Sequence, residues 1–117
     1  MPLIQLDTSC TLSDPDKRQS LAKNLSHLVA EGIGKPEQYV MACVHDNVAM
    51  TMSGSTGPCA LVTVKSIGGL SKVVNQTLAS QVGQMLQKEL ALPQNRVYLT
   101  FEDVAPTHWA WNSKTFG

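Results

Sequence analysis

Pro2 follows the first methionine directly, and it is the residue of this sequence with the clearest potential for chemistry. Aminopeptidases commonly remove methionine before a small residue, and this removal turns the Pro2 amide into a free secondary amine. The ordinary pKa of an α-amino group is about 7.7–8.0, and burial beside a cation lowers it because both effects disfavour the charged form. Pro2 is therefore a candidate general base at neutral pH. The alternative is a rigid first residue of a strand.

A second candidate is the turn Ser66-Ile67-Gly68-Gly69, which comes after a predicted strand and before a predicted helix. Free backbone N–H groups at such a turn can bind an anion, although an ordinary connection explains the same residues. The histidines have no partner at ligand spacing, and no glycine-rich phosphate motif follows a strand. We therefore expect neither a metal nor a cofactor.

The charge balance argues against two classes of partner. Nine Lys and Arg residues balance nine Asp and Glu residues, so we expect neither a nucleic acid nor an acidic membrane as partner. The sequence has no recognisable signal peptide and no run of ~20 apolar residues, which predicts a cytoplasmic protein. The three cysteines, Cys10, Cys43 and Cys59, are far apart and favour reduced thiols.

The chain repeats one pattern, which predicts a single domain over residues 1–117 with half-repeats at about 2–45 and 59–102. Residues 35–44 and 92–101 share a proline, a short polar turn and an apolar run. Apolar spacing predicts one helix from Ser13–Asp16 to Gly32 and another from Ser71 to just before Pro93. Strands are expected at about 3–8, 39–45, 59–66 and 97–102, with short extra strands at 48–52 and 109–111.

Two strand–helix–strand units with right-handed crossovers form an α+β fold, a four-stranded sheet with both helices on one face. The strands carry apolar residues on both faces, for example Met41 and Cys43 between Val40, Ala42 and Val44. Two helices cannot cover two faces, so we expect another subunit on the second face. The alternative is that loops and the C-terminal segment cover it.

Six motifs occur in order along the chain: MPLI at the start, GKPEQYVM at 34–41, SGSTGPCA at 53–60, KSIGG at 65–69, NRVYLTF at 95–101 and NSKTFG at 112–117. Together they resemble the macrophage migration inhibitory factor family over essentially the whole chain. The resemblance implies a β-α-β-β-α-β protomer that assembles as a homotrimer, with the sheets forming an inner β-barrel. This agrees with the second subunit that the strands predict.

The resemblance also implies a cofactor-free keto–enol tautomerase that acts on phenylpyruvate-like or dopachrome-like aryl acids in pockets between subunits. Pro2 would be the catalytic base, and Lys35 would bind the substrate carboxylate and lower the pKa of Pro2. The N–H of Ile67, in the turn with Ser66, would give a second anion contact. The other implied substrate-binding residues are Tyr98 from the adjacent subunit, Thr100, Tyr39, Trp111 and Phe116. Taken singly, Tyr98 reads equally as a core aromatic, Lys35 as a solvated cation and Phe116 as an anchor of the tail.

Some positions depart from the family pattern. Thr100 stands where relatives often have an Asn that binds substrate, so its shorter hydroxyl must reach further or act through water. Cys59 matches the first cysteine of a motif that is associated with redox activity in some members. The second cysteine of that motif is missing here, so we expect no dithiol chemistry. Phe101 replaces a frequent tyrosine.

Two alternative functions remain at the level of sequence. The first is a cytokine-like signalling ligand that is secreted without a signal peptide and binds a cell-surface receptor. The second keeps the proline base but applies it to small unsaturated or halogenated acids, as in the wider tautomerase superfamily.

Overall fold

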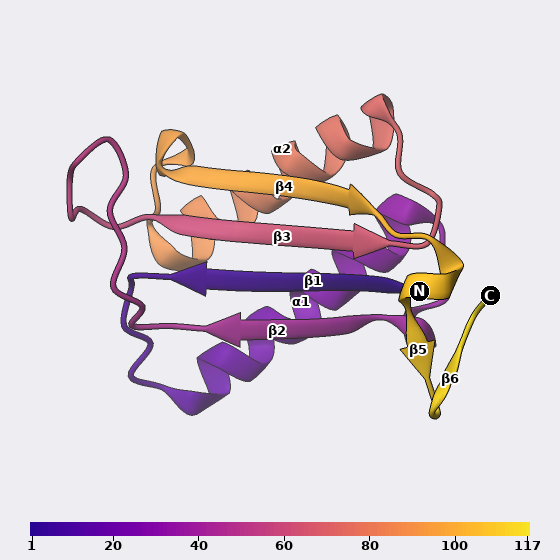
Figure 1. The fold of residues 1–117 in the computed structure, drawn as a ribbon. Coiled ribbons are helices and arrows are strands. Elements are labelled where there is room, and N and C mark those ends of the chain that lie inside the picture. The colour runs from indigo at the N-terminus through magenta and orange to yellow at the C-terminus, as the bar shows by residue number, and fades with distance from the viewer.

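The computed structural model describes residues 1–117 as one four-stranded sheet with two long helices behind it (Figure 1). The strands are ordered β2-β1-β3-β4, parallel within each half of the chain and antiparallel where β1 meets β3. This arrangement confirms the predicted α+β fold. The elements are β1 (Pro2–Thr8), α1 (Pro15–Ile33), β2 (Met41–His45), β3 (Ala60–Ser66), α2 (Lys72–Leu90) and β4 (Val97–Asp103).

Helix α1 begins where its capping residues predict and ends slightly later than expected. The Asp14 carboxylate accepts a hydrogen bond from the Asp16 N–H at 2.9 Å, and Pro15 opens the first turn. The helix continues through Gly32 and ends at Gly34, which adopts the left-handed conformation with φ of 78°. Gly32 has another role, because a Cβ there would lie 2.7 Å from Leu78 Cδ2. It allows α1 and α2 to approach closely.

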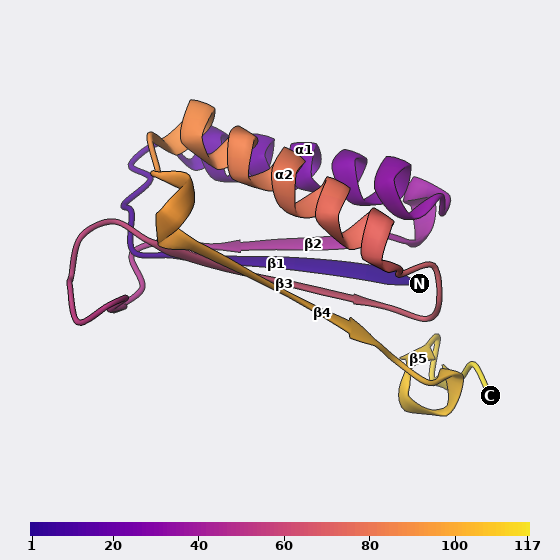
Figure 2. The same cartoon turned by 90° about the horizontal axis from the view of Figure 1, so that it is seen from above.

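The core lies between the helices and the sheet, and both helices cover the same face (Figure 2). The side chains that fill it are fully buried and aliphatic, because each helix turns one apolar stripe toward the inward side chains of the strands. They include Leu25, Val29, Leu78, Val82 and Leu86 from the helices, with Ile4, Leu6, Val62 and Val64 from the strands. This packing fixes the position of β1, which carries Pro2.

The other face of the sheet is more polar than the sequence suggested. The register places Gln5 beside Cys43 and Thr63, and Lys65 beside Leu3 and Glu102. Ion pairs join Lys65 to Glu102 at 3.5 Å and His45 to Asp7 at 3.2 Å. The expectation that the strands are apolar on both faces therefore fails for much of this face, because many side chains that alternate with the core residues are polar. The exposed hydrophobic side chains near its ends are Met41 and Tyr98.

Two predicted strand boundaries also need correction. Residues 39 and 40 are not in β2, because Glu37–Tyr39 form the 3-10 turn η1, which the Val40 N–H closes on the Glu37 carbonyl at 2.9 Å. The expected strand at 48–52 is absent, and only an isolated bridge joins Met52 to Ser55. Arg96 explains this loop, because its guanidinium donates to four backbone carbonyls between residues 52 and 58.

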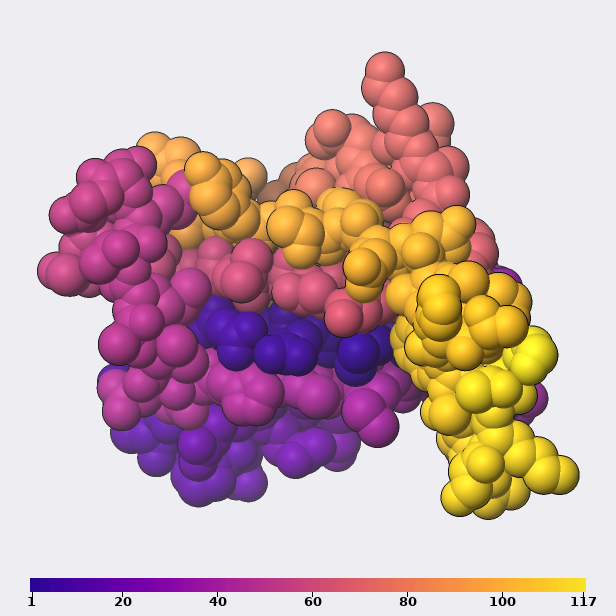
Figure 3. Space-filling view, in the orientation of Figure 1, coloured from indigo at the N-terminus to yellow at the C-terminus, as the bar shows by residue number.

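The short strand expected near Trp111 is confirmed as β5 (Ala110–Trp111), which pairs with β6 (Lys114–Thr115). This hairpin lies at the end of the sheet where β1 begins, on the side away from the helices (Figure 2). The space-filling view shows the C-terminal residues gathered over that end (Figure 3). Neither helix is long and apolar enough to cross a membrane.

Candidate functional site

Pro2 begins β1 at the end of the sheet where the candidate residues gather. It is buried, lies opposite Ser66 in the antiparallel ladder, and follows the partly buried Met1. A strand-initial proline leaves no ladder hydrogen bond unmade, so the sheet tolerates it here. The strand therefore holds the ring in a fixed place at the edge of the core.

Lys35 directly follows Gly34, the C-cap of α1, and its charge acts on the amine of the chain terminus. Its backbone N–H donates to the Ala30 carbonyl at 3.1 Å, and its side chain runs beside Gly69, where an added Cβ would lie 3.5 Å from Lys35 Cε. The pKa of the Met1 amine is lowered from its usual 8.0, first by burial and second by the positive charge of Lys35. Burial and a neighbouring cation thus both act on the Met1 amine, whereas Pro2 is an amide in this chain.

The turn after β3 directs a backbone donor at the terminus. The Ile67 N–H donates to the Met1 carbonyl at 3.3 Å. Gly68 and Gly69 have φ values of 74° and 82°, which explains why glycine occupies both positions. The buried Ser66 hydroxyl donates to the Gly68 carbonyl at 2.7 Å, so Ser66 holds the turn together.

A cavity of about 450 Å³ opens beside Met1 and contains two of the predicted aromatic residues. Tyr39 comes from η1 and Trp111 from the C-terminal hairpin, and both side chains are largely accessible. The aromatic wall suits a planar apolar group. Residues 38, 40 and 41 complete the lining and were not predicted. The strand register identifies Met41 as a neighbour of the site, because Met41 pairs with Leu3, the residue after Pro2.

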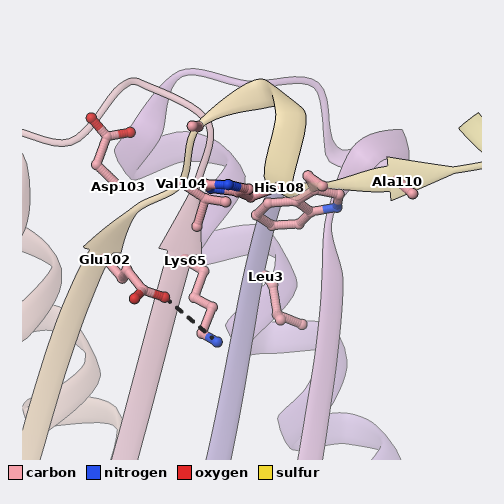
Figure 4. A pocket seen from close by; sticks show the side chains of 9 residues that line it. Leu3, Lys65, Glu102, Asp103, Val104, His108 and Ala110 are labelled. Carbon is pink, nitrogen blue, oxygen red and sulfur yellow. Dashed lines mark ion pairs between the residues drawn. The ribbon is translucent and has the colours of Figure 1, made fainter. Parts of the chain in front are cut away.

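A second cavity of about 430 Å³ lies on the outer side of the sheet near the same end (Figure 4). The Lys65–Glu102 ion pair forms its floor, and Trp109 and His108 contribute rings from the C-terminal segment. None of these residues is among the site residues predicted from the sequence. No group of three or more His, Cys, Asp or Glu side chains is arranged to hold a metal ion.

Tyr98 and Thr100 do not meet Pro2 within one chain, and Phe116 takes no part in either cavity. Tyr98 pairs with Leu61, five residues along β3 from the Ser66 that faces Pro2, which corresponds to about 17 Å. Thr100 pairs with Thr63 in the middle of the outer face. Phe116 is fixed through its N–H, which donates to the Trp109 carbonyl at 3.1 Å, and its side chain does not line either cavity. Within this chain Tyr98 lies at the opposite end of the sheet from Pro2.

Comparisons with known proteins agree on one family. The family model described as macrophage migration inhibitory factor (MIF) matches residues 1–117. The chain is 37% identical to a macrophage migration inhibitory factor homolog of Brugia malayi, over all of both chains, and 33% identical to macrophage migration inhibitory factor of Xenopus tropicalis, over 99% of each. A solved homologue from Prochlorococcus marinus has a TM-score of 0.91 and 41% identity, with 98% of this chain and 99% of that chain covered.

The protein of Toxoplasma gondii has the same TM-score, 0.91, with 32% identity and coverage of 97% of this chain and 99% of that one. The fold, the match over the full length and the sequence identity therefore all indicate the same family. This chain belongs to the macrophage migration inhibitory factor family.

Proposed function

We propose that this protein is a cofactor-free keto–enol tautomerase of small aryl keto acids, with the secondary amine of Pro2 as its general base. The observation that carries the proposal is the position of the buried Pro2 next to Met1, which lines an aromatic cavity and whose amine has a pKa lowered by burial and by Lys35. Removal of Met1 would transfer the amine to the buried Pro2. An amine that is neutral at pH 7 can accept a proton from carbon.

The reaction needs a base and a stabilised anion. Pro2 takes a proton from the carbon beside the substrate carbonyl, the electron pair of that C–H bond forms the C=C bond, and the C=O π pair moves to oxygen. That oxygen takes a proton from water, and the protonated Pro2 returns its proton to solvent, so the base is regenerated. No electrons enter or leave. Lys35 binds the substrate carboxylate, and the Ile67 N–H adds a second contact, because it already donates to a carbonyl oxygen at the terminus.

Met1 has a defined effect in this proposal. Its carbonyl accepts the Ile67 N–H at 3.3 Å, and it lines the cavity with Tyr39 and Trp111. The unprocessed chain therefore has an amide at Pro2 and a filled anion subsite. Processing creates the base and frees its anion donor in one step.

We further propose that the active form is a homotrimer in which a neighbour supplies Tyr98 and Thr100. Both are exposed in the single chain and lie away from Pro2. Tyr98 and Met41, on the face without helices, are 65% and 63% exposed, which is unusual for such large apolar side chains in an isolated domain.

Phenylpyruvate tautomerisation by the Met-free protein tests the proposal, with the solution mass measured on the same sample. Pro2→Gly changes the basicity and geometry of the terminal amine, and an Ala inserted before Pro2 blocks it. Both variants should have the same oligomeric state as the wild type, judged by solution mass, and should lose phenylpyruvate turnover. Undiminished turnover by the blocked form would exclude Pro2 as the base, and a monomeric mass would exclude the shared site.

One observation supports a second candidate. The vertebrate relatives carry a name that describes an effect on macrophage migration, so a signalling role with export from the cytoplasm is the alternative. Binding to cells that persists when Pro2 is blocked, together with undetectable turnover of aryl and short dienoic acids by the Met-free protein, would favour that role.

A further inference from the structure

We propose that Asp103 is a positioning residue that orients the Ile67 N–H toward the substrate carboxylate. The inference rests on the proposed function and adds a residue that lies outside the cavity beside Met1. Asp103 is the last residue of β4 and pairs with Ser66 at the end of β3. It is therefore next to the turn that carries the anion donor.

The segment Asp103–Val104 holds both peptide groups that flank Ile67. Asp103 Oδ1 accepts the Gly68 N–H at 2.9 Å, which fixes the peptide after Ile67. The Val104 N–H donates to the Ser66 carbonyl at 2.9 Å, which fixes the peptide before it. That second peptide contains the Ile67 N–H itself. A hydrogen bond to the carbonyl of a peptide polarises the N–H of the same peptide and strengthens it as a donor.

The Asp103 contact differs from the Val104 contact because its acceptor is a charged carboxylate, which strengthens a hydrogen bond from a backbone N–H. The two bonds are equally long, at 2.9 Å each, and the Asp103 bond is exposed to solvent. Figure 4 shows Asp103 directed away from the Lys65–Glu102 ion pair and toward the loop that follows β3. Its carboxylate is thus available to the turn and does not take part in that pair.

The clamp is needed because the turn is conformationally permissive. Gly68 and Gly69 both have positive φ, and glycine visits many other conformations at little cost. Nothing lies within 4 Å of the position that a Gly68 Cβ would occupy, so packing does not restrain this residue. Hydrogen bonds between Gly68 and the side chains of Asp103 and Ser66 therefore keep this residue in the conformation that aims Ile67 at the terminus.

The inference predicts different results for two substitutions at this position. Asp103→Ala removes the acceptor, so the Ile67 N–H loses its orientation and KM for phenylpyruvate should rise about five- to tenfold, the equivalent of one hydrogen bond. The value of kcat should change less than about threefold, because Pro2 is untouched. Asp103→Asn keeps an oxygen acceptor and should restore KM to within about twofold of wild type.

A neutral substrate separates positioning from a general structural effect. Deuterium exchange at the carbon next to the carbonyl can be followed by NMR for both phenylpyruvate and phenylacetaldehyde, and only the first carries a carboxylate. Asp103→Ala should lower kcat/KM for phenylpyruvate and leave that for phenylacetaldehyde within about twofold, since the second substrate has no carboxylate to bind.

The matched control is Asp46→Ala at the opposite end of the sheet. The Asp46 carboxylate also accepts a backbone N–H, from Leu12 at 2.8 Å, and is far from Pro2. This variant should lose stability without a change in KM. If Asp103→Ala does not fold, Asp103→Ser takes its place, because the shorter hydroxyl cannot span the distance to Gly68.

The outcomes distinguish the two proposals. Absence of phenylpyruvate turnover in the Met-free wild type would overturn the proposed function. An active wild type with unchanged KM in Asp103→Ala, an equal loss with both substrates, or no rescue by Asp103→Asn would overturn the positioning role alone.

Discussion

Replacement of Gly69 by alanine should destabilise the protein through two separate effects. Gly69 has a φ of 82°, and a side chain in the left-handed region costs about 1–2 kcal/mol. The added Cβ would also lie 2.6 Å from Ile33 Cγ2. Ile33 is only 8% exposed and packs in the core, so it cannot move freely, and overpacking of this kind costs about 1–3 kcal/mol. The expected loss is about 2–5 kcal/mol.

Gly54→Ala is the matched control, because it retains the first effect and lacks the second. Gly54 has a φ of 70°, and nothing lies within 4 Å of its Cβ position. Its expected loss is about 1–2 kcal/mol from the backbone conformation alone. The difference between the two variants therefore isolates the contact with Ile33.

Urea titrations at one fixed protein concentration give the free energies of unfolding, because the stability of an oligomer depends on concentration. Gly69→Ala should also raise KM for phenylpyruvate, since Ile33 and Lys35 must move together with the turn. Equal losses of stability in the two variants would refute the predicted clash. If Gly69→Ala loses the expected stability of about 2–5 kcal/mol but its KM for phenylpyruvate is unchanged, the link between this contact and the anion subsite is refuted.

Three further predictions concern charged groups. Lys35→Gln should raise the pKa of the terminal amine and move the acidic limb of the kcat/KM profile to higher pH, because the base works only when neutral. An NMR titration of that amine checks the direction. In the chain that retains Met1, the lowered pKa of the Met1 amine means that the unfolded chain binds more protons, so stability should rise with pH between the lowered value and the ordinary 8.0. Arg96→Ala should cost about 2–3 kcal/mol and speed amide exchange in the 52–58 loop, because several carbonyls lose a charged donor; protection equal to wild type would contradict this.

Local patterns were sufficient to predict most of the fold. The Asp14 cap, the apolar stripes of the two helices and the Pro turns specified where elements begin, because these signals act between near neighbours in the chain. The boundaries that failed depend on contacts between distant segments. Arg96 holds the 52–58 loop against β4, and Leu78 meets Gly32 across the helix pair, and neither contact leaves a local signal.

The candidate site also has a part that local sequence signals predict and a part that depends on contacts between distant segments. Residue type and family motifs were enough to identify Pro2, Lys35 and Ile67 as candidates. The tertiary structure added the lowered pKa of the Met1 amine and the hydrogen bond by which Ser66 stabilises the turn after β3. It also added the place of Met41 in the cavity and the role inferred for Asp103. These depend on register and burial, which bring together residues far apart in the chain.

The sequence by itself determined the order of the elements and the residues able to do chemistry, since both follow from side-chain types and short-range spacing. Only the tertiary structure decided which of them meet. It brought Lys35, Tyr39, Ile67 and Trp111 to the end of the sheet where β1 begins and left Tyr98 at the other end. The physical reason is that pairing between strands and packing of helices against them convert positions along the chain into positions in space.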